Sequence, residues 1–199
     1  MVKKQSRINF RHLYIQTATI EQQVSDMRLQ VGQRAPVFTM QGIIKGEIRD
    51  IHLEDYSGKW VVLFFYPGDF TFVCPTEVRE FSDRHDEFAE LDAHVLGVSV
   101  DSVHAHRAWL KELGELRYPL LSDITKEVSR SYEVLIEQKG VSLRGAFIID
   151  LEGILRYQVV HDLDIGRSVD EILRVLKALQ TGEMCPVEWK PGKSTLGKA

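Results

Sequence analysis

The chain has only two cysteines, Cys74 and Cys185, among its 199 residues. Two thiols are too few for the disulfide framework of a small secreted protein. The sequence also has no Cys-x-x-C motif, which argues against a dithiol oxidoreductase. In a reducing compartment isolated thiols are more often inert or catalytic than structural. The cysteines are therefore expected to be either small buried residues or reactive groups.

The sequence also lacks a long hydrophobic run and an excess of basic residues. Its longest apolar run is Trp60 to Tyr66, far short of the roughly 20 residues that span a bilayer, and no apolar segment follows the basic N-terminus as in a secretion signal. Lys and Arg number 25 against 29 Asp and Glu, a net charge of −4, so no overall positive field attracts nucleic acid or anionic lipids. We therefore expect a cytoplasmic protein with neither membrane nor nucleic acid as a partner.

Internal repeats and low-complexity tracts are absent as well. Hydrophobic residues make up 44% and charged residues 27% of the chain, as in ordinary globular proteins. The length predicts one domain with appendages rather than two domains. We expect an N-terminal extension over residues 1–30, a folded domain over 31–166, and a C-terminal helix and arm over 167–199.

Predicted strands and helices alternate along the folded part. The run 60–66 is apolar on both faces and predicts a buried strand at the centre of a sheet. The alternation, with a Glu152-Gly153 hairpin turn, predicts an α/β protein with a thioredoxin-like arrangement, in which helices flank a central mixed β-sheet. The other expected elements are a hairpin over 38–53, strands at 94–100, around Leu120, 145–150 and 154–160, and helices over 76–91, 102–113, 125–132 and 168–180.

Cys74 lies in the segment that connects the buried strand to the helix after it. The carboxyl edge of an open α/β sheet is where ligands bind, and Pro75 is tolerated in a first helical turn, whose amides lack partners within the helix. The positive end of the helix dipole favours a thiolate over a thiol. This position favours a reactive cysteine.

Formation of the thiolate does not by itself make Cys74 react fast. A less basic thiolate is also a weaker nucleophile, with a Brønsted slope of about 0.4 to 0.5, so further groups must orient the electrophile. Thr71, three residues before Cys74, is the nearest candidate, the alternative being that its hydroxyl only bonds nearby backbone. Pro67 ends the strand and would also shield one side of the thiol. Phe70 and Phe72 are interpreted as packing residues.

The segment Tyr66 to Glu77 (YPGDFTFVCPTE) resembles the Pro-x-x-x-Thr-x-x-Cys signature of peroxiredoxins of the alkyl hydroperoxide reductase and thiol-specific antioxidant type. The similarity continues through LGVSVDS, RGAFIID, GRSVDE and MCPVEWKPG and covers roughly residues 31 to 196. It implies a thioredoxin-like fold. It also implies a peroxidase that reduces hydrogen peroxide and alkyl hydroperoxides without metal, haem, flavin or any other cofactor.

The resemblance assigns a role to each matching residue. Cys74 is expected to be the peroxidatic cysteine, which attacks a peroxide oxygen, becomes a sulfenic acid and releases water or an alcohol. Thr71 and Arg144 are expected to bind the peroxide, and Pro67 to shield the thiolate. Arg144 suits this role because a guanidinium offers several fixed donors and stays protonated.

Two further residues are expected to support Arg144. Glu77 resembles the acid that positions this arginine, although an acid in the first turn of a helix is also favoured by the helix dipole alone. Arg167 is expected to be a second supporting arginine. His104 and His106 are two positions apart on a helix and so face different sides, which argues against a metal site.

Cys185 matches the resolving cysteine of typical two-cysteine members. The resemblance implies an intersubunit disulfide between Cys74 and Cys185, which a thioredoxin-like or dedicated disulfide reductase would reduce again. It also implies a homodimer that assembles into a ring, often a decamer. The strand 154–160, whose apolar pattern is interrupted by Arg156 and Gln158, is the edge expected to pair between subunits. The alternative function is an oligomeric holdase chaperone or redox-signalling scaffold.

The resemblance also bears on overoxidation of Cys74. Sensitive relatives have a Gly-Gly-Leu-Gly loop and a C-terminal helix with Tyr-Phe that pack over the first turn of the cysteine helix. Here the corresponding loop is Lys111 to Leu116 (KELGEL), and no such helix is expected after Trp189. Easier unwinding of that turn predicts fast disulfide formation and resistance to sulfinic acid formation.

Overall fold

The structure is a computed structural model that describes residues 28–198. Most of the expected extension over residues 1–30 therefore lies outside the described residues. Leu29 already belongs to the fold, because its side chain is buried and its amide donates to the carboxylate of Glu133 at 2.8 Å. Among the described residues, no helix is long and apolar enough to cross a membrane.

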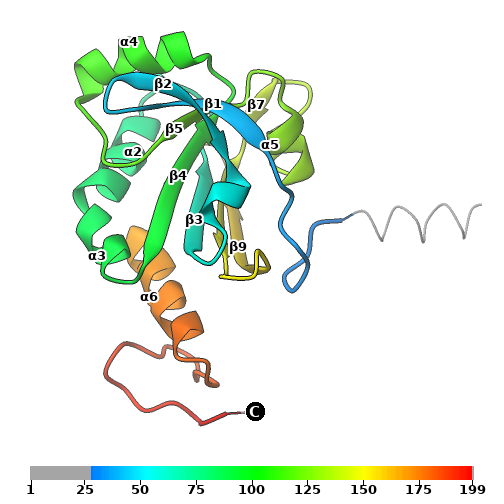
Figure 1. The fold of residues 1–199 in the computed structure, drawn as a ribbon, viewed down its shortest axis with the longest axis vertical. Helices are drawn as coiled ribbons and strands as arrows, with labels where there is room; N and C mark the ends of the chain where they lie inside the picture. The colour runs from blue at the N-terminus through cyan, green and yellow to red at the C-terminus, as the bar shows by residue number, and fades with distance from the viewer. Residues whose placement is uncertain (1–27, 199) are drawn as a thin grey trace, which may run out of the picture.

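Most strands join one mixed sheet (Figure 1), in the order β2-β1-β5-β4-β3-β8-β9. β3 pairs with β4, and β4 with β5, in parallel, whereas every other neighbouring pair is antiparallel. A separate two-stranded ribbon joins β6 to β7. The strands are β1 (Thr39–Ile44), β2 (Glu47–His52), β3 (Trp60–Phe65), β4 (Ala93–Ser99), β5 (Leu120–Ser122), β6 (Leu135–Ile136), β7 (Val141–Ser142), β8 (Arg144–Ile149) and β9 (Leu155–His161).

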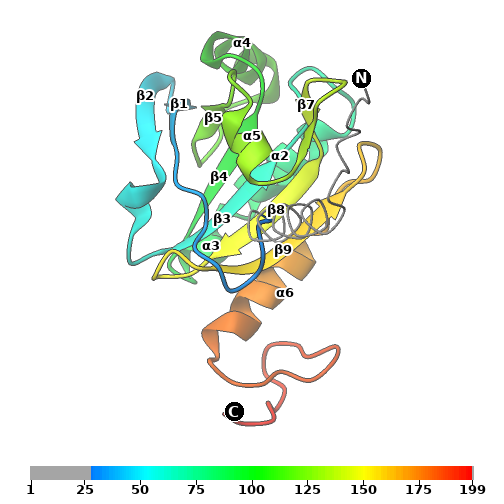
Figure 2. The same cartoon turned by 90° about the vertical axis from the view of Figure 1, so that its right-hand side faces the viewer.

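Helices cover both faces of the sheet (Figures 1 and 2), which confirms the predicted α/β fold. The apolar side chains of α2, α3, α4 and α6 pack on one face, and those of α5 on the other. The helices are the 3-10 turn η1 (Leu53–Tyr56), α2 (Cys74–Asp83), α3 (His85–Ala89), α4 (Val103–Leu113), α5 (Glu127–Ser131) and α6 (Val169–Gln180).

Strand β3 is buried on both sides, as its apolar run predicts. Val62 and Phe64 join the core on the side of α2 and α6, whereas Leu63 and Phe65 join the core on the opposite side. The prediction that this strand is the centre of the sheet needs correction, because β4 is the middle strand and β3 lies beside it. Both strands direct their carboxyl ends to the edge where α2 begins.

The single helix expected over residues 76–91 is two helices, with a break at Arg84. The backbone of Arg84 leaves the helical region, and its guanidinium bonds Glu87 at 2.7 Å and Asp170 of α6 at 2.5 Å. Phe81 and Phe88, on either side of the break, pack against the same core. The helical spacing of the apolar residues therefore continues across the break, so the sequence pattern predicts one uninterrupted helix.

Helix α6 belongs to the same core as α2. Ser168 caps its N-terminus by accepting a hydrogen bond from the amide of Glu171, and the face formed by Val169, Ile172, Leu173 and Leu176 is buried. After Gln180 the chain extends away from the sheet (Figure 1). It then folds back on itself, and the amide of Leu196 donates to the carbonyl of Met184 at 2.8 Å.

Candidate active site

Cys74 is the first residue of α2 and is completely buried. The loop of residues 66–73 leads to it from the carboxyl end of β3, and Pro75 follows it in the first helical turn. Proline fits there because the first amides of a helix have no partner within the helix. The sulfur therefore lies where the sheet edge meets a helix N-terminus, as the sequence predicts.

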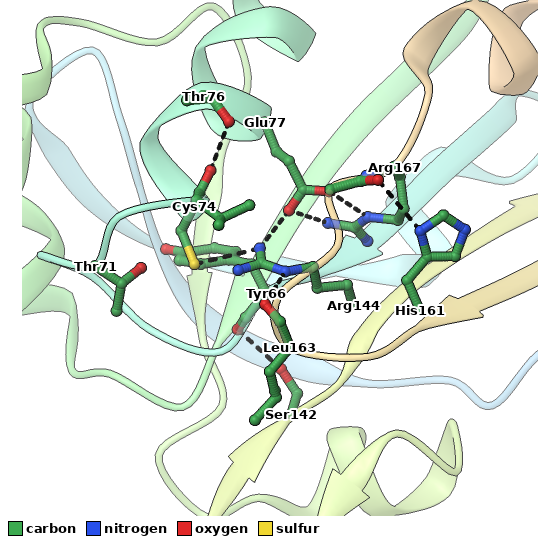
Figure 3. A network of polar contacts seen from close by, with 12 residues as sticks. Tyr66, Thr71, Cys74, Thr76, Glu77, Ser142, Arg144, His161, Leu163 and Arg167 are labelled. Atoms are coloured by element: carbon green, nitrogen blue, oxygen red, sulfur yellow. Dashed lines mark hydrogen bonds and ion pairs between the residues drawn. The ribbon is translucent and has the colours of Figure 1, made fainter.

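Arg144 places its guanidinium beside this sulfur (Figure 3). It is the first residue of β8 and only 2% exposed. Its Nη1 lies 3.4 Å from Sγ of Cys74 and 2.5 Å from Oε2 of Glu77, and its Nε donates to the carbonyl of Leu163 at 2.7 Å. These bonds fix the plane of the guanidinium, so one edge of it faces the thiol.

Glu77 binds two buried arginines at once. Besides Arg144, it accepts hydrogen bonds from the amide and Nε of Arg167 on Oε1, at 2.8 and 2.7 Å, and from Nη2 on Oε2 at 3.1 Å. Burial alone would raise the pKa of Glu77, but the hydrogen bonds and charge of Arg167, together with the charge of Arg144, lower it below the ordinary value. Glu77 is therefore an ionised buried group.

Arg167 completes this cluster from the segment before α6. Its Nη1 donates to the carbonyl of Gly145 at 2.5 Å, and its guanidinium lies 5.4 Å from the ring centre of Phe64. Two guanidinium groups and one carboxylate leave one excess positive charge among side chains that are at most 8% exposed. An anion at the sulfur would balance this charge.

Thr71 lies on the loop beside Cys74 (Figure 3) and is exposed. Its hydroxyl donates to the carbonyl of Gly68 at 3.1 Å, which is the backbone bond that the sequence left open as an alternative. The oxygen keeps lone pairs that can accept from a ligand. Pro67 directly follows the end of β3 and is half-buried.

The expectation that Phe72 is a packing residue is wrong for the single chain. Its side chain is 98% exposed. Phe70 is 55% exposed and contacts Trp109 in a tilted ring arrangement, with ring centres 6.3 Å apart. Trp109 itself is 3% exposed and belongs to the core. Phe70 and Phe72 flank Thr71 in this loop. The sequence pattern did not indicate that their side chains face outwards.

A buried polar network under the loop was not foreseen from the sequence. Asp69 accepts from the hydroxyl of Tyr66 at 2.8 Å, and its other oxygen lies 2.8 Å from Nδ1 of His106. Nε2 of His106 is 3.1 Å from the carbonyl of Leu121. Burial, followed by the negative charge of Asp69, raises the pKa of Tyr66 well above its ordinary value. The network ties the loop to α4 and β5.

Cys185 does not approach Cys74 within the chain. Arg167, which contacts the Cys74 site, precedes α6, and Cys185 follows the other end of this helix. Twelve residues of α-helix measure about 18 Å. The half-buried sulfur of Cys185 lies 3.7 Å from the hydroxyl of Thr181 and 3.8 Å from the carbonyl of Ala178. Both cysteines are free thiols.

Among residues 28–198, no three His, Cys, Asp or Glu side chains gather in a way that would hold a metal ion. His106 has hydrogen-bond partners at both ring nitrogens, as described above. The chemistry-bearing groups around Cys74 are accordingly a thiol, two guanidinium groups, a carboxylate and a hydroxyl. Such a set suits a reaction at sulfur in which charge moves to a departing oxygen.

Comparison with known proteins identifies the family of this chain. The model of the AhpC/TSA family matches residues 31–158, which is more than half of the chain. The putative peroxiredoxin YkuU of Bacillus subtilis is 57% identical over 83% of this chain and 97% of its own length. The chain is a peroxiredoxin of the AhpC/TSA family. Peroxiredoxin-2 of Mus musculus is 52% identical over 84% of this chain and 89% of its own length.

Solved structures agree with the assignment. The crystal structure of the reduced 2-Cys peroxiredoxin of Plasmodium vivax matches with a TM-score of 0.82 and 41% identity, over 84% of this chain and 93% of that one. AhpC of Enterococcus faecalis matches with a TM-score of 0.75 and 35% identity, over 78% and 98%. The fold is therefore thioredoxin-like, and this peroxiredoxin is a thiol-dependent peroxidase.

Proposed function

We propose that this peroxiredoxin reduces hydrogen peroxide and alkyl hydroperoxides at Cys74. The observation that carries the proposal is the guanidinium of Arg144, 3.4 Å from the buried sulfur at a helix N-terminus. The thiolate attacks the terminal peroxide oxygen, a sulfur–oxygen bond forms, and the oxygen–oxygen bond breaks. Sulfur loses two electrons, and the leaving oxygen takes up a proton to become water or an alcohol.

In this proposal the neighbouring residues act on the peroxide or on Arg144. Arg144 donates to the peroxide and stabilises the charge that develops on the leaving oxygen. The Thr71 hydroxyl orients the peroxide from the loop, and Pro67 shields the thiolate from water. Glu77 and Arg167 are positioning residues, because their bonds hold the guanidinium of Arg144 in its plane.

The second half of the proposed cycle uses Cys185 of a partner subunit. Within one chain α6 keeps the two sulfurs apart, so a disulfide inside the chain would require the helix to move. The thiol of Cys185 attacks the sulfenic acid of Cys74, water leaves, and an intersubunit disulfide forms. A thioredoxin-like or dedicated disulfide reductase in the cytoplasm then returns both cysteines to the thiol form.

A homodimer, with dimers assembled into a decameric ring, provides the partner subunit. β9 is an edge strand of the sheet, as expected, and no other strand of residues 28–198 occupies its outer side, where a second copy would pair. Phe70 and Phe72, exposed beside the active site, offer a second apolar contact for assembly of dimers.

Peroxide consumption by the reduced protein with a regenerating dithiol tests the proposal. The wild type should turn over, and Cys74→Ser should abolish turnover while retaining the far-ultraviolet circular dichroism of the fold. Activity that survives Cys74→Ser would contradict the role of Cys74. The alternative function, a holdase chaperone or redox-signalling scaffold, predicts instead that Cys74→Ser still suppresses aggregation of an unfolded client at the wild-type level.

A further inference from the structure

An apolar pocket lies between α4 and the turn that joins β1 to β2. Its volume is about 370 Å³, within the range of about 300 to 1,000 Å³ that small-molecule sites occupy. Ile43, Leu116 and Tyr118 form its base and are each at most 4% exposed, and the half-buried Leu110 lines it as well. The hydroxyl of Tyr118 donates to the carbonyl of Val78, so the ring offers the pocket an apolar face.

Cationic side chains surround the opening of this pocket. Lys45 comes from the turn, and Arg107 and Lys111 stand four residues apart on one face of α4. None of the three forms an ion pair with a described residue, whereas arginines elsewhere, such as Arg117 and Arg130, bind carboxylates. The one acid in the lining is Glu115, so the opening carries two excess positive charges.

The conformation of Lys45 is a second, independent observation. Its φ is 50°, a left-handed value, and Gly46 after it has a φ of 76°. A two-residue hairpin turn of this kind normally has Asn, Asp or Gly at the first position, because a longer side chain is strained there. Strained residues concentrate at functional sites. Here the strained residue contributes a lysine to the pocket.

We propose that this pocket binds an anionic amphiphile, a fatty acid with a single apolar chain and a terminal carboxylate. The chain would contact the base formed by Ile43, Leu116 and Tyr118, and the carboxylate would lie among the cations at the opening. The base offers no free polar group for a sugar or a nucleobase. The lining shares no residue with the Cys74 site, so this is a separate site from that of the peroxide.

Calorimetric titration of the reduced protein with dodecanoate, below its critical micelle concentration, tests the proposal. We expect saturable binding of one dodecanoate per chain. Reversing the charges of Arg107 and Lys111 to Glu should weaken binding about fivefold for each residue, because an exposed ion pair contributes at most about 1 kcal/mol. Arg34→Glu is the matched control, since Arg34 also has no ion pair with a described residue and lines a different pocket.

The apolar part of the site is tested with Ile44→Trp. Ile44 is the half-buried last residue of β1 and lines the pocket, so a larger side chain there narrows it. It should abolish binding while the thermal unfolding midpoint stays within a few degrees of the wild type. Dodecylamine should not bind. The proposal fails if dodecanoate does not saturate, if Arg34→Glu weakens binding as much as Arg107→Glu, or if dodecylamine binds equally well.

Discussion

At the scale of single residues, one carboxylate faces two buried guanidinium groups at the sulfur of Cys74. Glu77 is 4% exposed, and Arg144 and Arg167 are 2% and 8% exposed. A buried charge is stable only where opposite charges and hydrogen bonds replace the water that it loses. Each member of this cluster therefore depends on the others, and replacing one of them changes both stability and the environment of the thiol.

Replacing Arg144 with Met, or Thr71 with Val, should slow the reaction with hydrogen peroxide about a hundredfold or more for each residue, because orienting and charge-stabilising groups contribute at this level. Stopped-flow rates, measured beside a spectroscopic titration of the Cys74 thiolate, check this prediction. Arg130→Met, which breaks an exposed ion pair, is the control. A rate loss no larger than the loss of thiolate would mean that neither group acts on the transition state.

Glu77→Gln should destabilise the fold by about 3 to 5 kcal/mol, because two buried guanidinium groups lose their counter-charge. In the folded state the pKa of Glu77 lies below its ordinary value, so ionisation of Glu77 stabilises the fold. This contribution is complete at pH values above the ordinary pKa, and it is lost as the pH falls through the lowered pKa. Urea unfolding at a series of acidic pH values should therefore show a shallower decline for Glu77→Gln.

The control for this pH dependence is Glu137→Gln, because the pKa of Glu137 is lowered by Arg130 at a fully exposed site. Its effect on stability should be small, since exposed ion pairs contribute little. An unchanged acid slope in Glu77→Gln would show that Glu77 is not ionised in the folded state.

The sequence predicted the residues of this cluster but not the network beneath it. Cys74, Arg144, Glu77 and Arg167 follow from the resemblance, and the structure brings all four together. The contact between Asp69 and His106 spans 37 positions and exists only because α4 packs over the loop. No local pattern encodes such a contact, and the one available signal was that Asp69 is the only charged residue of the loop 66–73.

At the scale of elements, the segment just before α2 is exposed and carries no side-chain cap, although Cys74 and Glu77 of the first turn are buried. Val73, at the N-cap of α2, provides no side-chain cap, and Phe70, Thr71 and Phe72 before it are exposed. Between Gln180 and Lys198 the described chain forms no helix that covers this turn. Segments with few buried contacts open at low cost in free energy.

This turn should unwind quickly enough for Cys185 to trap the sulfenic acid before a second peroxide does. We therefore expect turnover to continue at peroxide concentrations that inactivate sensitive peroxiredoxins, which mass spectrometry of Cys74 after turnover at rising peroxide will check. Cys185→Ser serves as the comparison, since without a resolving thiol Cys74 should become sulfinic acid. Extensive sulfinic acid in the wild type at low peroxide would contradict easy unwinding.

At the scale of the whole molecule, the Cys74 site lies near the start of α6 and Cys185 follows its end, and β9 is an edge strand of the sheet that the described residues form. Both features support the proposal that the catalytic cycle uses two chains. After the buried Leu155, side chains along β9 alternate between exposed and half-buried positions, so one face of this strand is turned to solvent. The sequence predicted this edge from Arg156 and Gln158, which interrupt the apolar run.

Oxidation with one equivalent of hydrogen peroxide should convert the protein to a disulfide-linked dimer on non-reducing electrophoresis. The dimer band should disappear in Cys74→Ser and in Cys185→Ser, because each chain supplies one sulfur of each bond. Mixing the two variants should restore a dimer with a single disulfide. A monomer band that oxidation leaves unchanged in the wild type would exclude the intersubunit bond.

The position of β3 in the sheet also determines when the chain can fold during its synthesis. β3 lies between β4, which soon follows it in the chain, and β8, which is made only after α4, β5 and α5. Before residues 144–149 leave the ribosome, one side of an entirely apolar strand has no partner. Long-range pairing of this kind forms late and exposes aggregation-prone surface meanwhile. The nascent chain should therefore depend on chaperones until β8 emerges.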